Sequence, residues 1–363
     1  MLVLAYVYMF PASYIPTQFK SYLPFVPTAA LVFGFFFDLL TLNQPDALFE
    51  NIVIIGYLLL SAITMLLLQA RKNTESTNKR LVLLSILQFS FGNLASGLMI
   101  LYAHSGTFAG SAIFIGMLAL LLLSNELFRK RYARTHVRVT IWFVLLLTYS
   151  GLIVPILLNR IGAMVFVASA LLALMITYAY IQLLSYVTQE SFERARRNII
   201  ITVVAITLLF SGLYFSNLIP PVPLSLKHIG IYHSVVRTGN SYAATYEAPR
   251  WFEFWKDTSA SFNNESDSTT FCFTSVYAPT KLATDIRHRW EKYDEITETW
   301  ATIARIPFPI TGGRKDGFRG YTQTSQVDDG TWRCSVETAR GALIGRTVFE
   351  AQSGTPTLRS QEL

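Results

Sequence analysis

The sequence predicts an α-helical membrane bundle of about seven transmembrane helices, followed by a C-terminal all-β domain that is sandwich-like or barrel-like. Three observations predict this fold class. Long apolar runs fill the chain up to residue 219, a proline-rich stretch follows, and short alternating runs separated by turn signals continue to about residue 352. Only 15% of the residues are charged, against roughly 25% in soluble domains, which argues against an ordinary soluble enzyme.

The N-terminal segment 1–22 is apolar but is interrupted by Pro11. Its first run, Met1–Ile15, has no basic start and no small-residue cleavage site, which argues against a secretory signal peptide. We expect this segment to lie at the membrane interface. An additional membrane span is the alternative.

The bundle is expected over residues 23–219. A spanning helix needs about 20 mostly apolar residues, and seven stretches meet this requirement. They are Leu23–Leu40, Asn51–Leu68, Leu81–Ala103, Ser111–Phe128, Val139–Leu158, Ile161–Val187 and Ile199–Ile219.

Basic residues between the predicted spans indicate how the bundle is oriented. Three alternate loops hold twelve lysines and arginines, whereas the loops on the other side hold only Arg160. Because cytoplasmic loops are enriched in Lys and Arg, we expect the N-terminus in the cytoplasm and the chain after Pro220 outside. For a bacterium, this predicts a multi-pass protein of the inner (plasma) membrane with a periplasmic C-terminal domain.

The basic excess of the chain belongs entirely to its apolar part. Residues 1–224 carry a net charge of +7, whereas residues 225–363 hold 16 basic and 16 acidic side chains and are neutral. The isoelectric point near 9.3 therefore reflects membrane topology, and we expect no nucleic-acid partner.

Four polar or ionisable side chains fall inside the predicted spans: Asp38, Gln88, Asn93 and Glu126. Asp38 and Glu126 lie near span ends, whereas Gln88 and Asn93 are more central. Small residues flank Asn93, which favours a helix-packing face with interhelical hydrogen bonds over a polar substrate path. A transporter is therefore the alternative and not the first interpretation.

The chain after the bundle is divided into a proline-rich junction at 220–230, a β-rich domain at 231–352 and a flexible tail at 353–363. Eight strands are expected in the β-rich domain, because short runs rich in aromatic and β-branched residues alternate with turn signals. They are Ile231–Arg237, Ser241–Glu247, Thr270–Tyr277, Ile286–Tyr293, Trp300–Pro307, Phe318–Gln323, Thr331–Thr338 and Ala342–Glu350.

Both cysteines of the chain, Cys272 and Cys334, lie in predicted strands. Strand alternation places Cys334 on a buried face together with Trp332. In an oxidising compartment the two cysteines are candidates for a disulfide between strands or sheets, with two packed free thiols as the alternative. Their spacing matches no zinc motif, and no histidine is near in sequence, so a catalytic cysteine is not expected.

A group of basic and aromatic residues is the candidate ligand-binding site. Glycines at 312–320 allow sharp turns, and arginines bind phosphate or carboxylate groups through two parallel hydrogen bonds, so we expect an anionic lipid headgroup or acidic glycan as ligand. The alternative is a glycine-rich hairpin whose arginines pair only with glutamate and aromatic side chains. The candidate residues are His288, Arg289, Trp290, Arg314, Arg319 and Arg333.

Motifs that carry a known chemistry are absent from the sequence. It contains no phosphate-binding loop, no HExxH zinc motif and no GxSxG nucleophile motif. No pair of carboxylates is spaced for acid–base work. We therefore expect no catalytic residue, no metal site and no cofactor.

Five stretches of the C-terminal part share a recognisable pattern, at residues 219–224, 288–290, 306–314, 317–322 and 330–338. They resemble a bacterial membrane-protein family whose C-terminal module is a domain of unknown function, number 2914. The resemblance implies a multi-spanning envelope protein with a C-terminal β-rich domain. It supplies no activity, cofactor or catalytic residue.

These observations together predict a non-enzymatic membrane protein. The bundle would sit in the lipid bilayer and present a β-sandwich that binds an envelope lipid, glycan or protein partner. A transporter, or a membrane enzyme of envelope lipid metabolism with the β domain as a cap, is the alternative. A sensor ranks last because the cytoplasmic loops are too short to hold an output module.

Overall fold

The computed structural model describes residues 36, 38–39, 45–70, 77–105, 108–127, 134–187, 193–249, 258–264, 269–313, 316–325 and 327–363. The chain divides into two compact units. The first is helical and ends at Ser216, and the second, which we call the β domain, comprises Asn217–Leu363 together with the short segments His104–Ala112 and Asn159–Gly162.

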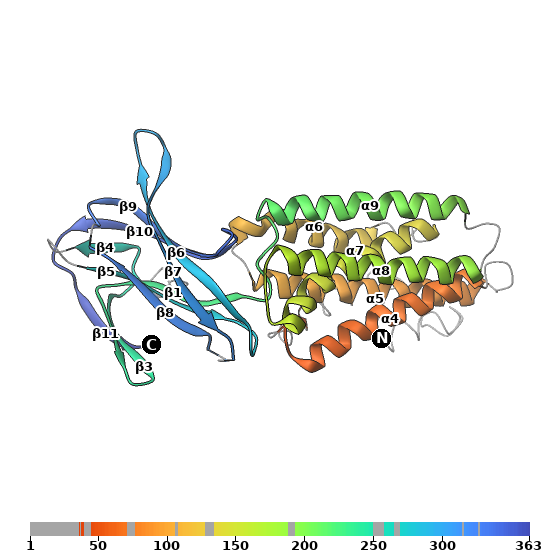
Figure 1. Ribbon diagram of the computed structural model, residues 1–363, viewed down its shortest axis with the longest axis horizontal. Coiled ribbons are helices and arrows are strands. Elements are labelled where there is room, and N and C mark those ends of the chain that lie inside the picture. Colours follow the sequence, from red (N-terminus) through yellow and green to blue (C-terminus); the bar gives the residue numbers. More distant parts are fainter. Residues whose placement is uncertain are drawn as a thin grey trace, which may run out of the picture. The chain divides into compact units, whose positions relative to one another are not determined.

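Six long helices make up the described part of the helical unit (Figure 1). Five of them are long and apolar enough to cross a membrane, as in a multi-pass membrane protein, and the described side chains of α6 form a shorter apolar stretch, Ser111–Leu123. The helices are α4 (Leu48–Ala70), α5 (Thr77–Ala103), α6 (Phe108–Leu127), α7 (Thr135–Leu158), α8 (Ala163–Val187) and α9 (Glu193–Phe215).

The helix count in the described residues is six and not the predicted seven. Each of the six helices coincides with one predicted span. The predicted span at 23–40 lies almost entirely outside the described residues, as does the run at 1–15. The difference therefore falls on the N-terminal stretch, of which only residues 36 and 38–39 within the predicted span are described.

Hydrogen bonds inside the bundle connect neighbouring helices. Trp142 on α7 donates its indole N–H to the carbonyl of Leu58 on α4 at 3.1 Å, and the Tyr180 hydroxyl on α8 donates to the carbonyl of Ala62 at 2.8 Å. In an apolar environment such bonds satisfy groups that would otherwise be unpaired, so they hold neighbouring helices in register.

In the described part of the β domain, eleven strands form three sheets. The sheet orders are β1-β5-β8, β4-β10-β9-β6-β7 and β11-β3-β2. The strands are β1 (Ser225–Tyr232), β2 (Ser234–Thr238), β3 (Ser241–Glu247), β4 (Ser261–Asn264), β5 (Thr270–Tyr277), β6 (Ala283–Asp294), β7 (Thr299–Thr311), β8 (Phe318–Thr324), β9 (Gly330–Thr338), β10 (Leu343–Ser353) and β11 (Leu358–Glu362).

The main core lies between the five-stranded sheet and the sheet β1-β5-β8, as in a β-sandwich. Side chains from both sheets meet there, among them Ile231, Trp290, Trp332 and Phe349. The other face of β1-β5-β8 is also covered, because Phe273 packs against side chains of β2 and β3. Strand β5 is therefore buried on both faces, which explains its continuous apolar and hydroxyl-bearing sequence.

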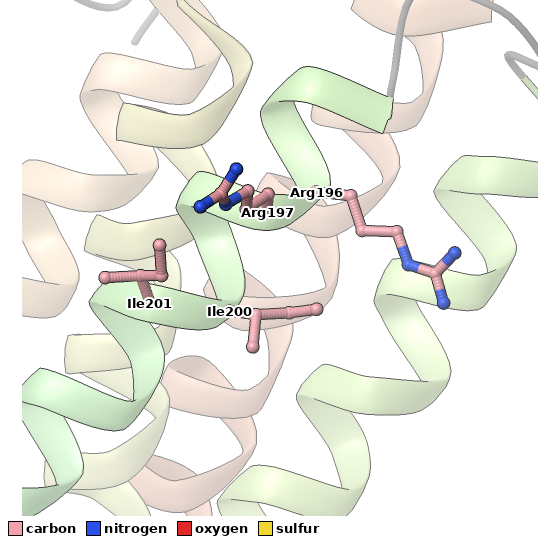
Figure 2. A pocket seen from close by; sticks show the side chains of 4 residues that line it. All are labelled: Arg196, Arg197, Ile200 and Ile201. Carbon is pink, nitrogen blue, oxygen red and sulfur yellow. The ribbon is translucent and has the colours of Figure 1, made fainter.

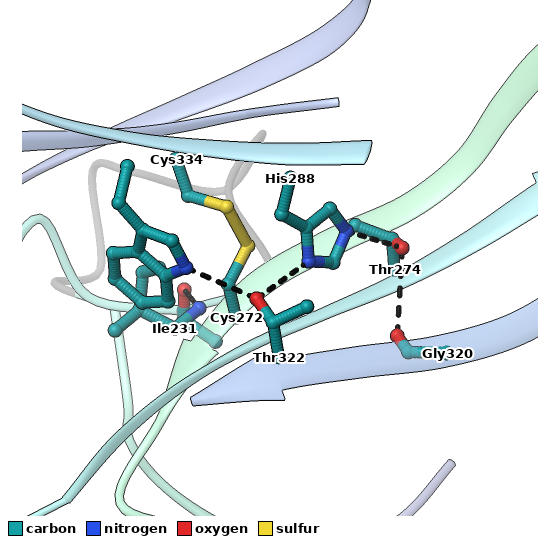
Figure 3. Close-up of a disulfide and its surroundings, with 9 residues drawn as sticks. Ile231, Cys272, Thr274, His288, Gly320, Thr322 and Cys334 are labelled. Carbon is teal, nitrogen blue, oxygen red and sulfur yellow. Dashed lines mark hydrogen bonds between the residues drawn. A yellow bond between two sulfur atoms is a disulfide. The ribbon is translucent and has the colours of Figure 1, made fainter. Parts of the chain in front are cut away.

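A disulfide between Cys272 on β5 and Cys334 on β9 crosses this core and joins the two sheets (Figure 3). Both cysteines are fully buried. The indole of Trp290 lies in the same hydrophobic cluster as the disulfide. The bridge thus links segments 62 residues apart in the chain, and such a link restricts the unfolded state.

The strand pattern differs from the expectation in two respects. The predicted strand at 231–237 is divided, because β1 ends at Tyr232 and β2 begins at Ser234 and joins another sheet. Strands β4 and β11 were not predicted. Both are short edge strands that are held by pairing with β10 and β3, so local sequence does not mark them.

Candidate anion-binding surface

The two faces of strand β6 have different chemistry because side chains alternate along a strand. Ile286, His288 and Trp290 point into the sandwich core and are 0–1% exposed. Arg287 and Arg289 point to the other side of the five-stranded sheet, where they remain partly exposed. One strand therefore contributes to the core with one face and to a charged surface with the other.

His288 is held inside the core by two hydroxyl groups. Its Nε2 lies 3.0 Å from Oγ1 of Thr274, and its Nδ1 lies 2.9 Å from Oγ1 of Thr322 (Figure 3). Trp290 donates its indole N–H to the same Thr322 oxygen at 3.0 Å. Burial lowers the pKa of His288 to about 3, so the imidazole is neutral at physiological pH.

The outer surface of the five-stranded sheet carries a network of arginines and glutamates. Cross-strand pairing brings these side chains together from four strands, β7, β6, β9 and β10. We call this surface the arginine face. Its residues are Arg287, Arg289, Glu291, Arg305, Arg333, Ser335, Glu337 and Arg346.

Two arginines are fixed by the glutamates of this face. Arg333 donates to both carboxylate oxygens of Glu291, at 2.5 and 3.0 Å, and its guanidinium stacks on the ring of Trp300 at 4.0 Å. Arg287 donates to Glu337 at 2.6 Å. Both glutamates are at most 2% exposed, so the pairs compensate carboxylates that have lost their water.

The other three arginines are less well compensated. Arg289 Nε lies 3.4 Å from a carboxylate oxygen of Glu291 and 3.5 Å from one of Glu337, without hydrogen-bond geometry to either. Arg305 and Arg346 form no ion pair within 4.0 Å in the described part of the chain. Burial lowers the pKa of Arg346, the positive charges of Arg333 and Arg289 lower it further, and the negative charges of Glu291 and Glu337 act in the opposite direction.

The arginine face is consequently positive. Five arginines oppose two glutamates, which leaves three net positive charges. These seven residues lie in three central rows of the sheet, where a row is the set of residues paired directly across neighbouring strands. Two further acidic residues on the same face, Asp285 and Glu350, are exposed and lie in the outermost rows. A surface of this kind attracts anions and orients them by hydrogen bonds from guanidinium groups.

The sequence-based candidates are only partly brought together. Arg289 and Arg333 share the arginine face, whereas His288 and Trp290 lie on the opposite side of the sheet, inside the core. Arg319 is on β8, in another sheet, and donates to the carbonyl oxygen of Leu363 at 3.1 Å. Arg314 lies outside the described residues.

Other members of the arginine face were missed by sequence reasoning. Alternation within the predicted strands places Arg287 on the same side as Arg289, and Ser335 on the same side as Arg333. The sequence therefore contained the information that these two residues share the face. Arg305 and Arg346 come from neighbouring strands. Their inclusion depends on strand order and register, which a single sequence does not specify.

Polar residues of the bundle form no comparable site in the described residues. Asn93 donates its side-chain amide to the carbonyl of Phe89 at 2.8 Å. This bond lies within α5, whereas the prediction was of hydrogen bonds between helices. Gln88 is half-buried on the same helix α5, and Asp38 is half-buried in a short described helical stretch. The side chain of Glu126 lies outside the described part.

A shallow depression lies beside the first turns of α9 and is lined by Arg196, Arg197, Ile200 and Ile201 (Figure 2). The two arginine side chains point away from each other and do not converge on one point. This arrangement suits contact with a membrane surface better than a defined ligand site.

Comparison with protein families identifies part of the β domain. Residues 283–351, from the start of β6 into β10, match the family described as "Protein of unknown function (DUF2914)". This match confirms the family resemblance of the C-terminal module, although the stretch at 219–224 lies outside it. All residues of the arginine face fall within the matched range.

No curated protein matches the chain. Among solved structures, one match is the alkylpurine DNA glycosylase AlkC of Pseudomonas fluorescens bound to DNA containing an abasic site analog. The match covers 84% of this chain and 99% of that chain at 10% identity, with a TM-score of 0.23. A TM-score this low carries no argument about fold or function.

The buried imidazole predicts how stability depends on pH. Between pH 6.5 and about 3 the unfolded chain binds a proton at His288 that the folded chain does not bind. The free energy of unfolding should therefore fall as the pH falls through this range, by up to about 1.4 kcal/mol per pH unit. The His288→Gln variant should be less stable at pH 7.5 but should lose less stability on acidification. Chemical unfolding in detergent, followed by Trp fluorescence, measures both slopes, and equal slopes would contradict this assignment.

The ion pairs predict that Glu291 contributes strongly to stability. Glu291→Gln removes the charge that compensates Arg333 and should lower the free energy of unfolding by about 2 kcal/mol. This is less than the ~3–5 kcal/mol for breaking a fully buried pair, because the arginines are partly exposed. Glu350→Gln, at an exposed position of the same sheet face, is the matched control and should change it by less than about 0.5 kcal/mol. Similar losses for the two variants in the same unfolding assay would show that the network is not stabilising.

Proposed function

We propose that this protein is a non-enzymatic binding protein of the bacterial cell envelope, in which the helices span the inner membrane and the β domain binds an anionic partner outside. The observation that carries the proposal is the positive charge of the arginine face, with five arginines against two buried glutamates. The bound component would be an envelope lipid, with an acidic glycan or protein as further partners of the same surface.

The periplasmic location is supported by the charges that flank α9. This helix starts beside Arg194, Arg196 and Arg197, and its other end leads into the β domain. Basic residues mark the cytoplasmic ends of spans. The orientation of the β domain therefore depends on α9 and does not require that residues 23–40 span the membrane.

A lipid is favoured as partner because the connection to the membrane is short. Only nine residues separate the end of α9 from the start of β1, and such a segment extends at most ~30 Å. The connection is restricted further by three prolines, Pro220, Pro221 and Pro223. The β domain therefore remains near the membrane surface, where anionic headgroups are concentrated.

The orientation is tested by reporter fusions after Leu363, one active only outside the cytoplasm and one active only inside it. We expect the outside reporter to be active. The same location should keep Cys272 and Cys334 oxidised, so that neither thiol reacts with an alkylating reagent when cells are lysed in denaturant without reductant. An active cytoplasmic reporter together with alkylated cysteines would overturn the proposed location.

Anion binding is tested by charge reversal on the arginine face. We expect the full chain, reconstituted in phosphatidylcholine nanodiscs, to bind phosphatidylglycerol vesicles more tightly than phosphatidylcholine vesicles. Arg305→Glu combined with Arg346→Glu should weaken this binding at least tenfold, because each basic residue near an anionic membrane contributes about 1 kcal/mol.

The matched control combines Arg237→Glu and Arg359→Glu, which make the same charge change at exposed positions of β2 and β11. This pair should retain most of the binding. An equal loss for both pairs would show a nonspecific charge effect. Absence of binding by the unmodified chain, both to these vesicles and to heparin as a polyanionic glycan, would overturn the function.

A further inference from the structure

One row of the arginine face has an unusual composition. Strand pairing places Arg305, Arg289, Ser335 and Arg346 directly beside one another across β7, β6, β9 and β10. Ser335 is short and lies between two long side chains. Adjacent strands lie ~4.8 Å apart, so Arg289 and Arg346 are ~10 Å apart at the backbone, and their head groups can reach over the serine.

Three neighbouring residues of this row carry polar atoms without a hydrogen-bond partner among the described residues. These atoms are Nε of Arg289, Oγ of Ser335 and Nε of Arg346, and all three are buried. Ser335 itself is 0% exposed. Buried polar groups are nearly always paired in native proteins, so three adjacent exceptions indicate a missing acceptor.

The two glutamates of this region are hydrogen-bonded to other arginines. Glu291 is bound by Arg333 and Glu337 by Arg287, and neither has hydrogen-bond geometry to Arg289. A water molecule would satisfy one or two donors but would leave Arg346, which has no ion pair within 4.0 Å among the described residues, without a charged partner. An anion satisfies the donors and the charge together.

The arrangement of the donors favours a tetrahedral anion. They come from three strands, and two of them belong to separate guanidinium groups, so they approach a bound group from different directions. A carboxylate offers two oxygens in one plane and suits a single arginine fork, whereas a phosphate group offers three terminal oxygens in three directions.

We propose that Arg289, Ser335 and Arg346 form a binding site for one phosphate group, with the serine hydroxyl as the central donor and the guanidinium groups on either side. The inference rests on the proposed function and names the chemical class that the arginine face recognises. Arg305, the fourth member of the row, contributes long-range attraction. The phosphate group belongs either to a lipid headgroup or to a soluble phosphate compound.

The site is tested with inorganic phosphate as the probe. We expect the full chain, purified in an uncharged detergent, to bind one phosphate per chain in isothermal titration calorimetry at constant ionic strength. Ser335→Ala and Arg346→Met should each weaken binding about tenfold or more, as expected for losing a hydrogen bond to a charged group. Arg237→Met, which removes an exposed arginine of β2, should bind as the unmodified chain does.

Two measurements make the result unambiguous. Ser335→Ala should be at least as stable as the unmodified chain without phosphate, because it removes an unpaired buried hydroxyl, so weaker binding by this variant does not reflect unfolding. Acetate should bind more weakly than phosphate at the same ionic strength. Equal binding of acetate and phosphate, no phosphate binding at all, or equal phosphate binding by all variants would overturn the site.

The source of the phosphate is distinguished with phosphatidylcholine vesicles that contain or lack phosphatidic acid. If vesicles with phosphatidic acid bind and compete with inorganic phosphate, the group is a lipid headgroup. If only inorganic phosphate binds, with the expected effect of Ser335→Ala, the group belongs to a soluble compound. Both results support the site.

The site and the proposed function fail in different ways. In one outcome, binding to phosphatidylglycerol vesicles depends on Arg305 and Arg346, but Ser335→Ala and the unmodified chain bind inorganic phosphate with equal affinity. The phosphate site is then wrong, and the proposed function stands. If phosphate binds with the expected pattern but no anionic vesicle or heparin binds, the site stands and the envelope-binding function is wrong.

Discussion

Burial of two carboxylates, Glu291 and Glu337, is the constraint on which the charged surface of this protein depends. A carboxylate that loses its water needs a positive partner, and Arg333 and Arg287 supply it at 2.5–3.0 Å. These pairs also order the strands, because each connects β6 to β9 across the centre of the sheet. Once they are formed, Arg289 keeps only longer contacts of 3.4 and 3.5 Å to these carboxylates, and Arg346 has no ion pair within 4.0 Å among the described residues. The row between the two pairs is the one proposed to bind an external anion.

The same two strands build the core with their opposite faces. His288 and Trp290 of β6 lie against the disulfide and share Thr322 as a hydrogen-bond partner. This apolar face keeps the imidazole neutral, whereas the charged face begins one residue away at Arg289. A shift of one residue in the pairing of β6 would exchange the two faces, so the core residues fix the register on which the arginine face depends.

Periodicity of the sequence predicts much of this architecture. Apolar runs long enough to span a membrane correspond to the six described helices, and alternation correctly indicates buried Trp332 beside partly exposed Arg333. Sheet order is not contained in such local patterns. The row of Arg305, Arg289, Ser335 and Arg346 joins residues up to 57 positions apart, and only register across four strands brings them together. His288 and Arg289 are adjacent in sequence, yet they lie on opposite sides of a sheet, so proximity in sequence was misleading for the site.

The neutral composition of the β domain conceals this surface. Residues 225–363 hold equal numbers of acidic and basic side chains, which by itself argues against attraction to anions. The charges are segregated, however, because Asp294, Glu295 and Glu298 gather at the β6–β7 turn whereas the arginines occupy the sheet. A neutral domain with a positive face has little general affinity for polyanions, but it presents that face to them preferentially. Segregation of charge at constant net charge would therefore direct the proposed binding to one face, which a uniformly basic domain would not do.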